Sequence, residues 1–165
     1  MLEKVSFGLS ILALVTSAAL AMRQLVLSRH TNMLPILIDV YQEYRDVEFK
    51  SHVFYVLTKL RTDHEPTQTG FRFLPEPAST HVRVTSHFFD NLGVLVRSGA
   101  VDERFIISFT GDTIESVWTV LEPYIEQERV FKDGDYQEFF EDLVVRVRKN
   151  PPWRVRRAMK LQKVK

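Results

Sequence analysis

This 165-residue chain contains no cysteine, so it has no thiol nucleophile or thiolate ligand, and its first candidates for chemistry are histidine and carboxylate side chains. His87 and Asp90 are three residues apart, so on a helix both would face one side, as two metal ligands or a base and its orienting group do. A metal site needs further donors, and the HExxH pattern is absent. We therefore expect no metal or cofactor, and we interpret His87 as a surface or partly buried histidine satisfied by Asp90 or Asn91.

A second candidate is Thr110-Gly111-Asp112-Thr113, which is similar to a loop that approaches phosphate. One glycine is too few to cradle a phosphate, whereas Asp112, followed three residues later by Glu115, is typical of a helix start. The chain has no nucleophile elbow, P-loop, kinase or dinucleotide-binding pattern. The sequence favours a binding protein, and the alternative is a membrane-tethered enzyme whose site lies under residues 62–77 and uses His81 or His87.

Basic residues are concentrated at the C-terminal end of a chain whose formal net charge is only +1. Residues 143–165 contain nine bases and no acid, which leaves 13 positive and 21 negative charges, a net −8, on residues 1–142. Together with the one tryptophan of this segment, the bases form a predicted anionic-surface site: Arg146, Arg148, Lys149, Trp153, Arg154, Arg156, Arg157, Lys160, Lys163 and Lys165.

Three partners would suit these charges. Each lysine or arginine near an anionic leaflet contributes about 1 kcal/mol, so lipid headgroups are one. The acidic face of residues 122–142, on the same chain or a sister chain, is an equally weighted alternative. Nucleic acid needs the same residue types but is disfavoured, because the net negative charge of residues 1–142 opposes its approach.

The N-terminal stretch from Val5 to Met22 contains 18 residues without a charge, between Lys4 and Arg23. As a helix it would be about 27 Å long, close to the roughly 30 Å of a bilayer's hydrocarbon core. The stretch therefore predicts a single transmembrane anchor over residues 1–28. The alternative is a signal peptide cleaved after Ala19-Leu20-Ala21, which would leave a secreted helical domain.

The charges flanking this stretch favour a cell-membrane protein with its C-terminal domain in the cytoplasm, since Arg23 and Arg29 follow it and only Lys4 and the terminal amine precede it. Small residues in the span, between Ser17 and Ala21, and apolar stripes over residues 34–60 would permit a homo-oligomer or a membrane-protein partner.

Helical periodicity dominates the remaining chain and predicts an all-α bundle of five or six helices over residues 32–149. We expect a helix starting at Pro35 with Asn32 as its cap, followed either by a second helix capped by Asp46 or by a continuation through Asp46 as one long kinked helix. One long loop over residues 62–77 follows, and its Phe71-Arg72-Phe73 is apolar enough to dock back.

The second half of the bundle begins with a helix over residues 82–96 that Gly99 ends as a left-handed cap. A short helix then starts at Asp102 and breaks at Gly111, and the next contains Pro123, which should kink it near residues 120–122. A last helix over residues 136–147 stops before Pro151, and residues 150–165 form a basic tail.

One stretch of this bundle resembles a known family. The run from His87 to Asp102, HFFDNLGVLVRSGAVD, followed by Trp118, by Pro123-Tyr124-Ile125 and by Arg129, is similar to uncharacterised bacterial proteins that share the domain of unknown function 4760. The resemblance covers roughly residues 5–145. It implies an N-terminal hydrophobic helix followed by a small helical domain, which favours the anchor over the signal peptide, and it implies no activity.

Overall fold

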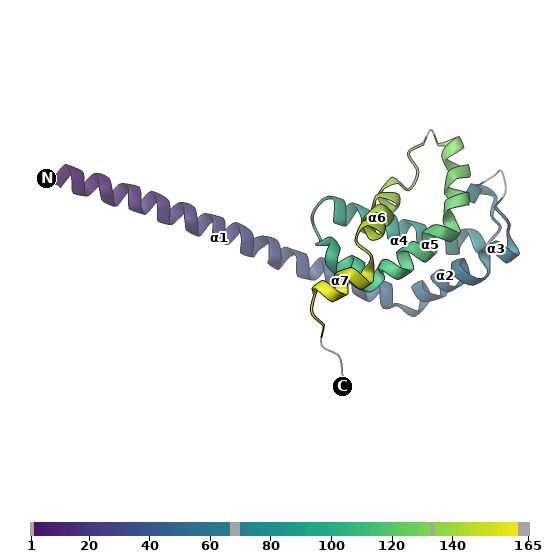
Figure 1. Ribbon diagram of the computed structural model, residues 1–165. Helices are drawn as coiled ribbons and strands as arrows, with labels where there is room; N and C mark the ends of the chain where they lie inside the picture. The colour runs from purple at the N-terminus through teal and green to yellow at the C-terminus, as the bar shows by residue number, and fades with distance from the viewer. Residues whose placement is uncertain (1, 67–69, 133, 162–165) are drawn as a thin grey trace. The chain divides into compact units, whose positions relative to one another are not determined.

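The computed structural model describes residues 2–66, 70–132 and 134–161, without the side chains of residues 2–7, 9 and 25–32 (Figure 1). The chain forms two compact units, residues 1–38 and residues 39–165. Over the described residues it is all-helical, which confirms the predicted class. The elements are α1 (Leu2–Arg45), α2 (Val47–Thr58), α3 (Leu60–Asp63), the 3₁₀ helix η1 (Gly70–Phe73), α4 (Ala78–Arg97), α5 (Glu103–Phe131), α6 (Glu138–Lys149) and α7 (Pro152–Ala158).

The first unit consists of helix α1 up to residue 38. The helix start expected at Asn32 and Pro35 is wrong, because α1 continues through Pro35. The described side chains from residue 10 to residue 24 are all exposed. None of the helices, over the residues described, combines the length and the apolar character that a membrane span needs. The transmembrane helix expected over residues 1–28 therefore has no support in the described part of the chain.

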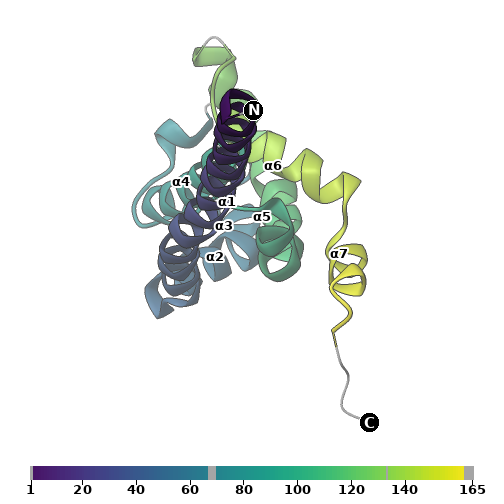
Figure 2. The same cartoon turned by 90° about the vertical axis from the view of Figure 1, so that its left-hand side faces the viewer.

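The second unit is built around helix α4, which packs on α6 and α2 (Figure 2). Phe89 and Leu92 of α4 are fully buried, and the Phe89 ring stacks on Phe140 of α6 with ring centroids 5.3 Å apart. Gly93 lets the two helices approach closely: a Cβ atom at this position would lie 2.1 Å from the carbonyl oxygen of Phe139. The backbone of α6 therefore occupies the space of a side chain.

Several local signals are confirmed at the helix ends of this unit. The Asp46 carboxylate accepts hydrogen bonds from the amides of Glu48 and Phe49 and so caps α2. Asp102 caps α5 by accepting from the amide of Arg104. Gly99 has φ of +73° and follows the last turn of α4, as expected for a left-handed cap.

Helix α5 differs from the expectation because it is one helix of 29 residues rather than two. Neither a break at Gly111 nor a cap at Asp112 exists. Gly111 is instead a contact point for α7, since an added Cβ atom would lie 2.6 Å from Cγ of Pro152. A glycine inside a helix indicates either a break in the helix or a site where another element packs closely against it. At Gly111 the second reading holds, because α7 packs there.

Helix α5 also continues through Pro123. A proline cannot donate to the carbonyl four residues before it, which is that of Thr119. The guanidinium group of Arg61, from α3, donates a hydrogen bond to this carbonyl oxygen. A side chain from another helix therefore supplies a donor where the proline removes one, and the kink expected near residues 120–122 stays a prediction.

The segment expected to be one loop over residues 62–77 is partly helical, since α3 extends to Asp63 and η1 covers Gly70–Phe73. Residues 67–69 lie outside the described part. Phe71 docks as expected, stacked on Tyr124 at 6.0 Å, whereas Phe73 remains 67% exposed. The tyrosine hydroxyl in turn donates to the carbonyl of His64, so Tyr124 of α5 contacts the segment at two points, His64 and Phe71.

Candidate functional site

His81, one of the two histidines proposed for an enzymatic site, pairs with a histidine that sequence reasoning did not select. Nδ1 of His81, on α4, lies 2.8 Å from Nδ1 of His52, on α2, so one ring donates and the other accepts. The Tyr55 ring stacks on His81 at 4.4 Å, and His52 is only 8% exposed. This pair joins α2 to α4 across a partly buried contact.

Burial lowers the pKa of His81 below its ordinary value, the neighbouring His52 lowers it further, and Glu76 acts in the opposite direction. His81 therefore binds a proton more readily in the unfolded chain than in the folded one. The contribution of neutral His81 to the free energy of unfolding is fully present above the ordinary histidine pKa, and it is lost as the pH falls below that value. We expect the free energy of unfolding to decrease from pH 7 to pH 5, by at most about 1.4 kcal/mol per pH unit for this group.

Urea denaturation at each pH measures this dependence. His81→Gln keeps a hydrogen-bonding partner for His52 and should flatten the pH dependence, whereas His87→Gln, at an exposed position of the same helix, should leave it unchanged. A His81→Gln curve parallel to that of the native chain would contradict the assignment.

His87 does not share a site with His81. The two residues are six positions apart on α4, which corresponds to about 9 Å of rise and a different helix face. His87 is exposed. Asp90 Oδ1 accepts a hydrogen bond of 3.0 Å from the amide of Phe140, and the interpretation that Asp90 or Asn91 satisfies His87 stays a prediction. Gln137, which precedes α6, makes no side-chain cap, so Asp90 of α4 serves as that cap.

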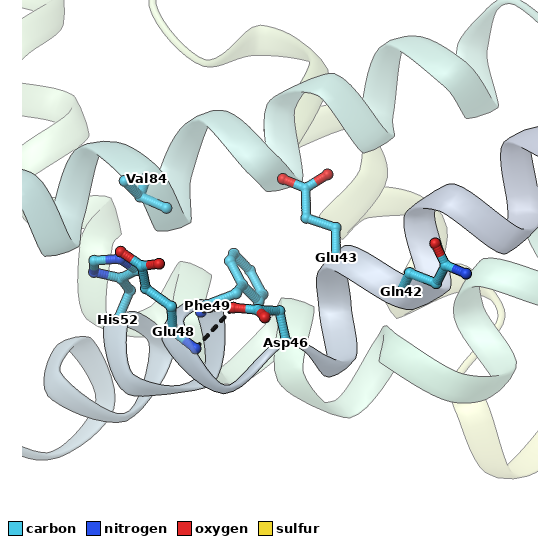
Figure 3. A pocket seen from close by; sticks show the side chains of 7 residues that line it. All are labelled: Gln42, Glu43, Asp46, Glu48, Phe49, His52 and Val84. Atoms are coloured by element: carbon cyan, nitrogen blue, oxygen red, sulfur yellow. Dashed lines mark hydrogen bonds between the residues drawn. The ribbon is translucent and has the colours of Figure 1, made fainter.

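A shallow pocket of about 470 Å³ lies beside the histidine pair, between the C-terminal end of α1, α2 and α4 (Figure 3). Seven residues line it: Gln42, Glu43, Asp46, Glu48, Phe49, His52 and Val84. The Asp46 carboxylate is already engaged in capping α2, and one nitrogen of His52 is engaged by His81. Over the described residues, no group of three or more histidine, aspartate or glutamate side chains is arranged to hold a metal ion.

The predicted anionic-surface site is divided by the structure into two groups of residues. In the first group each arginine contacts a carboxylate. Arg146 lies 2.9 Å from Glu103 and 2.7 Å from Asp142. Arg148 and Arg156 continue this series, at 3.0 Å from Glu115 and 3.1 Å from Asp112 respectively.

Three of these four pairs bring α6 and α7 to the first half of α5, through Glu103, Glu115 and Asp112. The fourth joins Arg146 to Asp142, one turn earlier on α6 and within the acidic residues 122–142. Arg156 also donates to the carbonyl of Ser108 at 2.9 Å. Asp112, which the sequence suggested as a helix cap or phosphate contact, is therefore the partner of Arg156. Because these pairs are half-exposed, each contributes little stability, and the burial of Pro152 and Val155 is the larger contribution to the docking of α7.

The second group is exposed. Trp153, Arg154, Arg157 and Lys160 point away from the core, as does Lys149 at the end of α6. In the part of the chain that the structure describes, no carboxylate lies within 4.0 Å of these four cations. Lys163 and Lys165 lie outside the described residues. The four described cations and the tryptophan are the members of the predicted site that remain available to an external partner.

Sequence reasoning also missed a buried carboxylate. The side chain of Glu128 is 5% exposed and lies 3.0 Å from the Arg72 guanidinium group. Its second oxygen has no hydrogen-bonding partner among the described residues, and Gly70 approaches it so closely that a Cβ atom would lie 2.8 Å away. The helical spacing of Glu128 from Leu121, Tyr124 and Ile125, all on the buried face of α5, was the signal that could have identified it.

Over its described residues the chain is all-helical. His81, one of the two candidate catalytic histidines, joins α2 to α4, His87 is exposed, and the basic helix α7 packs on α5 with one side exposed. The chain matches the family described as Domain of unknown function (DUF4760) over residues 11–147, and it belongs to that family. No curated protein and no solved structure matches it.

The residues on which the family resemblance rests have structural roles in this chain. Phe88 and Phe89 are buried, Asp90 caps α6, Gly93 permits the crossing of α4 and α6, and Gly99 ends α4. Asp102 then caps α5. These residues of the motif therefore define how α4, α5 and α6 begin, end and cross.

Proposed function

We propose that the protein is a single-pass membrane protein whose helical domain acts by binding, as a scaffold or regulatory subunit at the cytoplasmic surface of the cell membrane. The observation that supports this most directly is the exposed apolar surface of residues 10–24. Six large apolar side chains in this stretch are between 48% and 73% exposed: Ile11, Leu12, Leu14, Val15, Leu20 and Met22. A contiguous exposed apolar surface of this kind indicates a partner that covers it.

The chemistry of that surface favours lipid as the partner. The stretch Val5–Met22 contains no charged side chain, whereas a protein-binding helix ordinarily has a polar face. Four of its residues, Val5, Ser6, Phe7 and Leu9, have side chains outside the described part, so the uncharged stretch is longer than the surface that the structure describes. Thr16 donates its hydroxyl to the carbonyl of Leu12 at 2.7 Å, which satisfies its polar group within the helix.

Alkaline carbonate extraction of membranes that contain the full chain tests the proposal. We expect the native chain to stay in the membrane pellet. Leu14→Arg places a charge near the centre of the stretch. This makes membrane insertion less favourable by about 3 kcal/mol, which is on the order of 100-fold in the insertion equilibrium, so carbonate should release much of the protein. Val47→Arg, at a position of the second unit that is 82% exposed, is the matched control and should remain in the pellet.

Complete extraction of the native chain by carbonate would contradict the anchor. The orientation is tested on the same membranes with Ser98→Cys, because the chain has no other cysteine and residue 98 is exposed. For a cytoplasmic domain, a membrane-impermeant maleimide should label this cysteine only after the membrane is permeabilised. Labelling of intact cells would reverse the orientation.

A further inference from the structure

The exposed side of α7 differs from the rest of the basic segment. Pro152 and Val155 face α5 and are buried, with Val155 only 7% exposed. Trp153 and Arg157 are four residues apart and so share the opposite side of the helix. Arg154 lies beside them, and Lys160 follows just after the helix ends. We call these four residues, Trp153, Arg154, Arg157 and Lys160, the outer face of α7.

The cations of the outer face are not neutralised by the domain. Four carboxylates near α6 and α7 are already paired with arginines outside the outer face: Glu103 and Asp142 with Arg146, Glu115 with Arg148, and Asp112 with Arg156. Among the described residues, no further carboxylate lies within 4.0 Å of a cation of α7. The chain has no acidic residue after Asp142. The Arg154 guanidinium carbon lies 5.5 Å from the centre of the Trp153 ring, so this charge is held next to an exposed aromatic surface. The outer face therefore combines uncompensated positive charge with apolar area.

This combination suits the headgroup layer of a bilayer. Trp153 is 58% exposed, and Leu161, which follows Lys160, is 62% exposed. Met159 instead lines a pocket with Val155 and with Ile107 of α5. Tryptophan is favoured where one side of a ring meets apolar chains and the other meets water, and long cationic side chains reach phosphates from the same depth. A nucleic acid would satisfy the cations but leave Leu161 in water.

We propose that the outer face of α7 is a docking surface for anionic lipid headgroups. The proposal rests on the membrane anchor of the proposed function, because an anchored chain holds α7 near the bilayer at high effective concentration and makes weak contacts sufficient. Arg146, Arg148 and Arg156 act differently: they hold α6 and α7 on α5 and so position the outer face.

Tryptophan fluorescence of the full chain in lipid vesicles tests the docking. The chain has two tryptophans, and Trp118 is buried at 2% exposure, so Trp153 is the one that reports on its surroundings. The variant Trp153→Phe retains only Trp118, so its emission gives the Trp118 fluorescence that is subtracted. We expect a blue shift of Trp153 and quenching by brominated lipid in vesicles of phosphatidylcholine with phosphatidylglycerol, but not in phosphatidylcholine alone. At about 0.5 M salt, where screening lengths fall below about 5 Å, the difference should be lost.

A triple variant isolates the cations of the outer face. Arg154→Gln, Arg157→Gln and Lys160→Gln together should abolish the shift in anionic vesicles. The matched control removes three exposed cations elsewhere, by Lys50→Gln, Lys59→Gln and Arg97→Gln, and should keep the shift despite the same change in net charge. A shift that both variants retain, or that both lose, would overturn the assignment to α7.

The remaining outcomes separate the two proposals. If the chain floats with phosphatidylcholine vesicles but Trp153 is identical in both lipid compositions, the anchor stands and the docking surface is wrong. If the chain floats only with anionic vesicles and salt releases it, the docking surface stands and the anchor is wrong. If a single-stranded RNA, but not anionic vesicles, protects Trp153 from iodide quenching, the partner is nucleic acid and the lipid assignment is overturned.

Discussion

Gly93→Ala is expected to destabilise the second unit by about 3 kcal/mol, although alanine is the better helix former in isolation. The added methyl group would lie 2.1 Å from the carbonyl oxygen and 2.5 Å from the carbonyl carbon of Phe139. These are backbone atoms of α6, so no side-chain rotation can relieve the clash, and the two helices must move apart. In a chain of this size the loss corresponds to a decrease in Tm of roughly 6–12 °C.

The measurement is thermal unfolding of the full chain followed by far-ultraviolet circular dichroism in a fixed detergent. Asn91→Ala is the control, because Asn91 is exposed on the same helix and its replacement adds no contact. It should shift Tm by no more than a degree or two. An unchanged Tm for Gly93→Ala would mean that α4 and α6 do not cross as closely as described.

Arg72→Met is the second large effect. Arg72 is the main charge partner of Glu128, whose carboxylate is 5% exposed, while Lys132 is farther away at 3.9 Å. Breaking a buried pair by removing one partner costs about 3–5 kcal/mol, and we expect about 2–3 kcal/mol here because Arg72 is itself 39% exposed. The Arg72 guanidinium carbon also lies 4.5 Å from the centre of the Phe131 ring, so Arg72→Met removes this cation–π contact together with the ion pair.

A double-mutant cycle separates two effects of Arg72→Met: the unpaired charge left on Glu128 and the lost packing of the Arg72 side chain. In the Arg72→Met background, Glu128→Gln removes the uncompensated charge and should recover part of the stability, whereas in the native background it should be destabilising. Arg83→Met is the control, since the Arg83–Glu76 contact is 3.6 Å long and both side chains are more than half exposed. Equal losses for Arg72→Met with and without Glu128→Gln would show that the ion pair contributes nothing measurable.

The parts of the fold that could be predicted from the sequence are those that depend on neighbours along the chain. Asp46 and Asp102 cap the amides two or three residues ahead of them, and Gly99 adopts a positive φ at the next turn. The apolar stripes placed the buried faces of α2, α4 and α6 for the same reason. The family resemblance of residues 87–102 pointed to the family that the chain belongs to.

The expectations that proved wrong and the roles that were missed concern residues whose role depends on another element. Gly111 resembled a helix break, but it is the contact point of Pro152 in α7. Asp90 was selected only as a possible partner for His87, and its role in capping α6 from α4 was missed. No spacing rule along one helix connects positions so far apart in the chain, so these roles could not be derived from periodicity.

For the basic C-terminal site, too, some properties follow from the sequence and others only from the packing of the helices. The sequence alone established where the basic residues are, that no acid accompanies them, and that an uncharged stretch lies near the start of the chain, because charge and apolar character belong to the residues themselves. Only the tertiary structure decided which arginines pair with Glu103, Asp112 and Glu115 and which cations of the outer face of α7 stay exposed. An ion pair needs two side chains within a few ångströms of each other, and that proximity is set by how the helices pack.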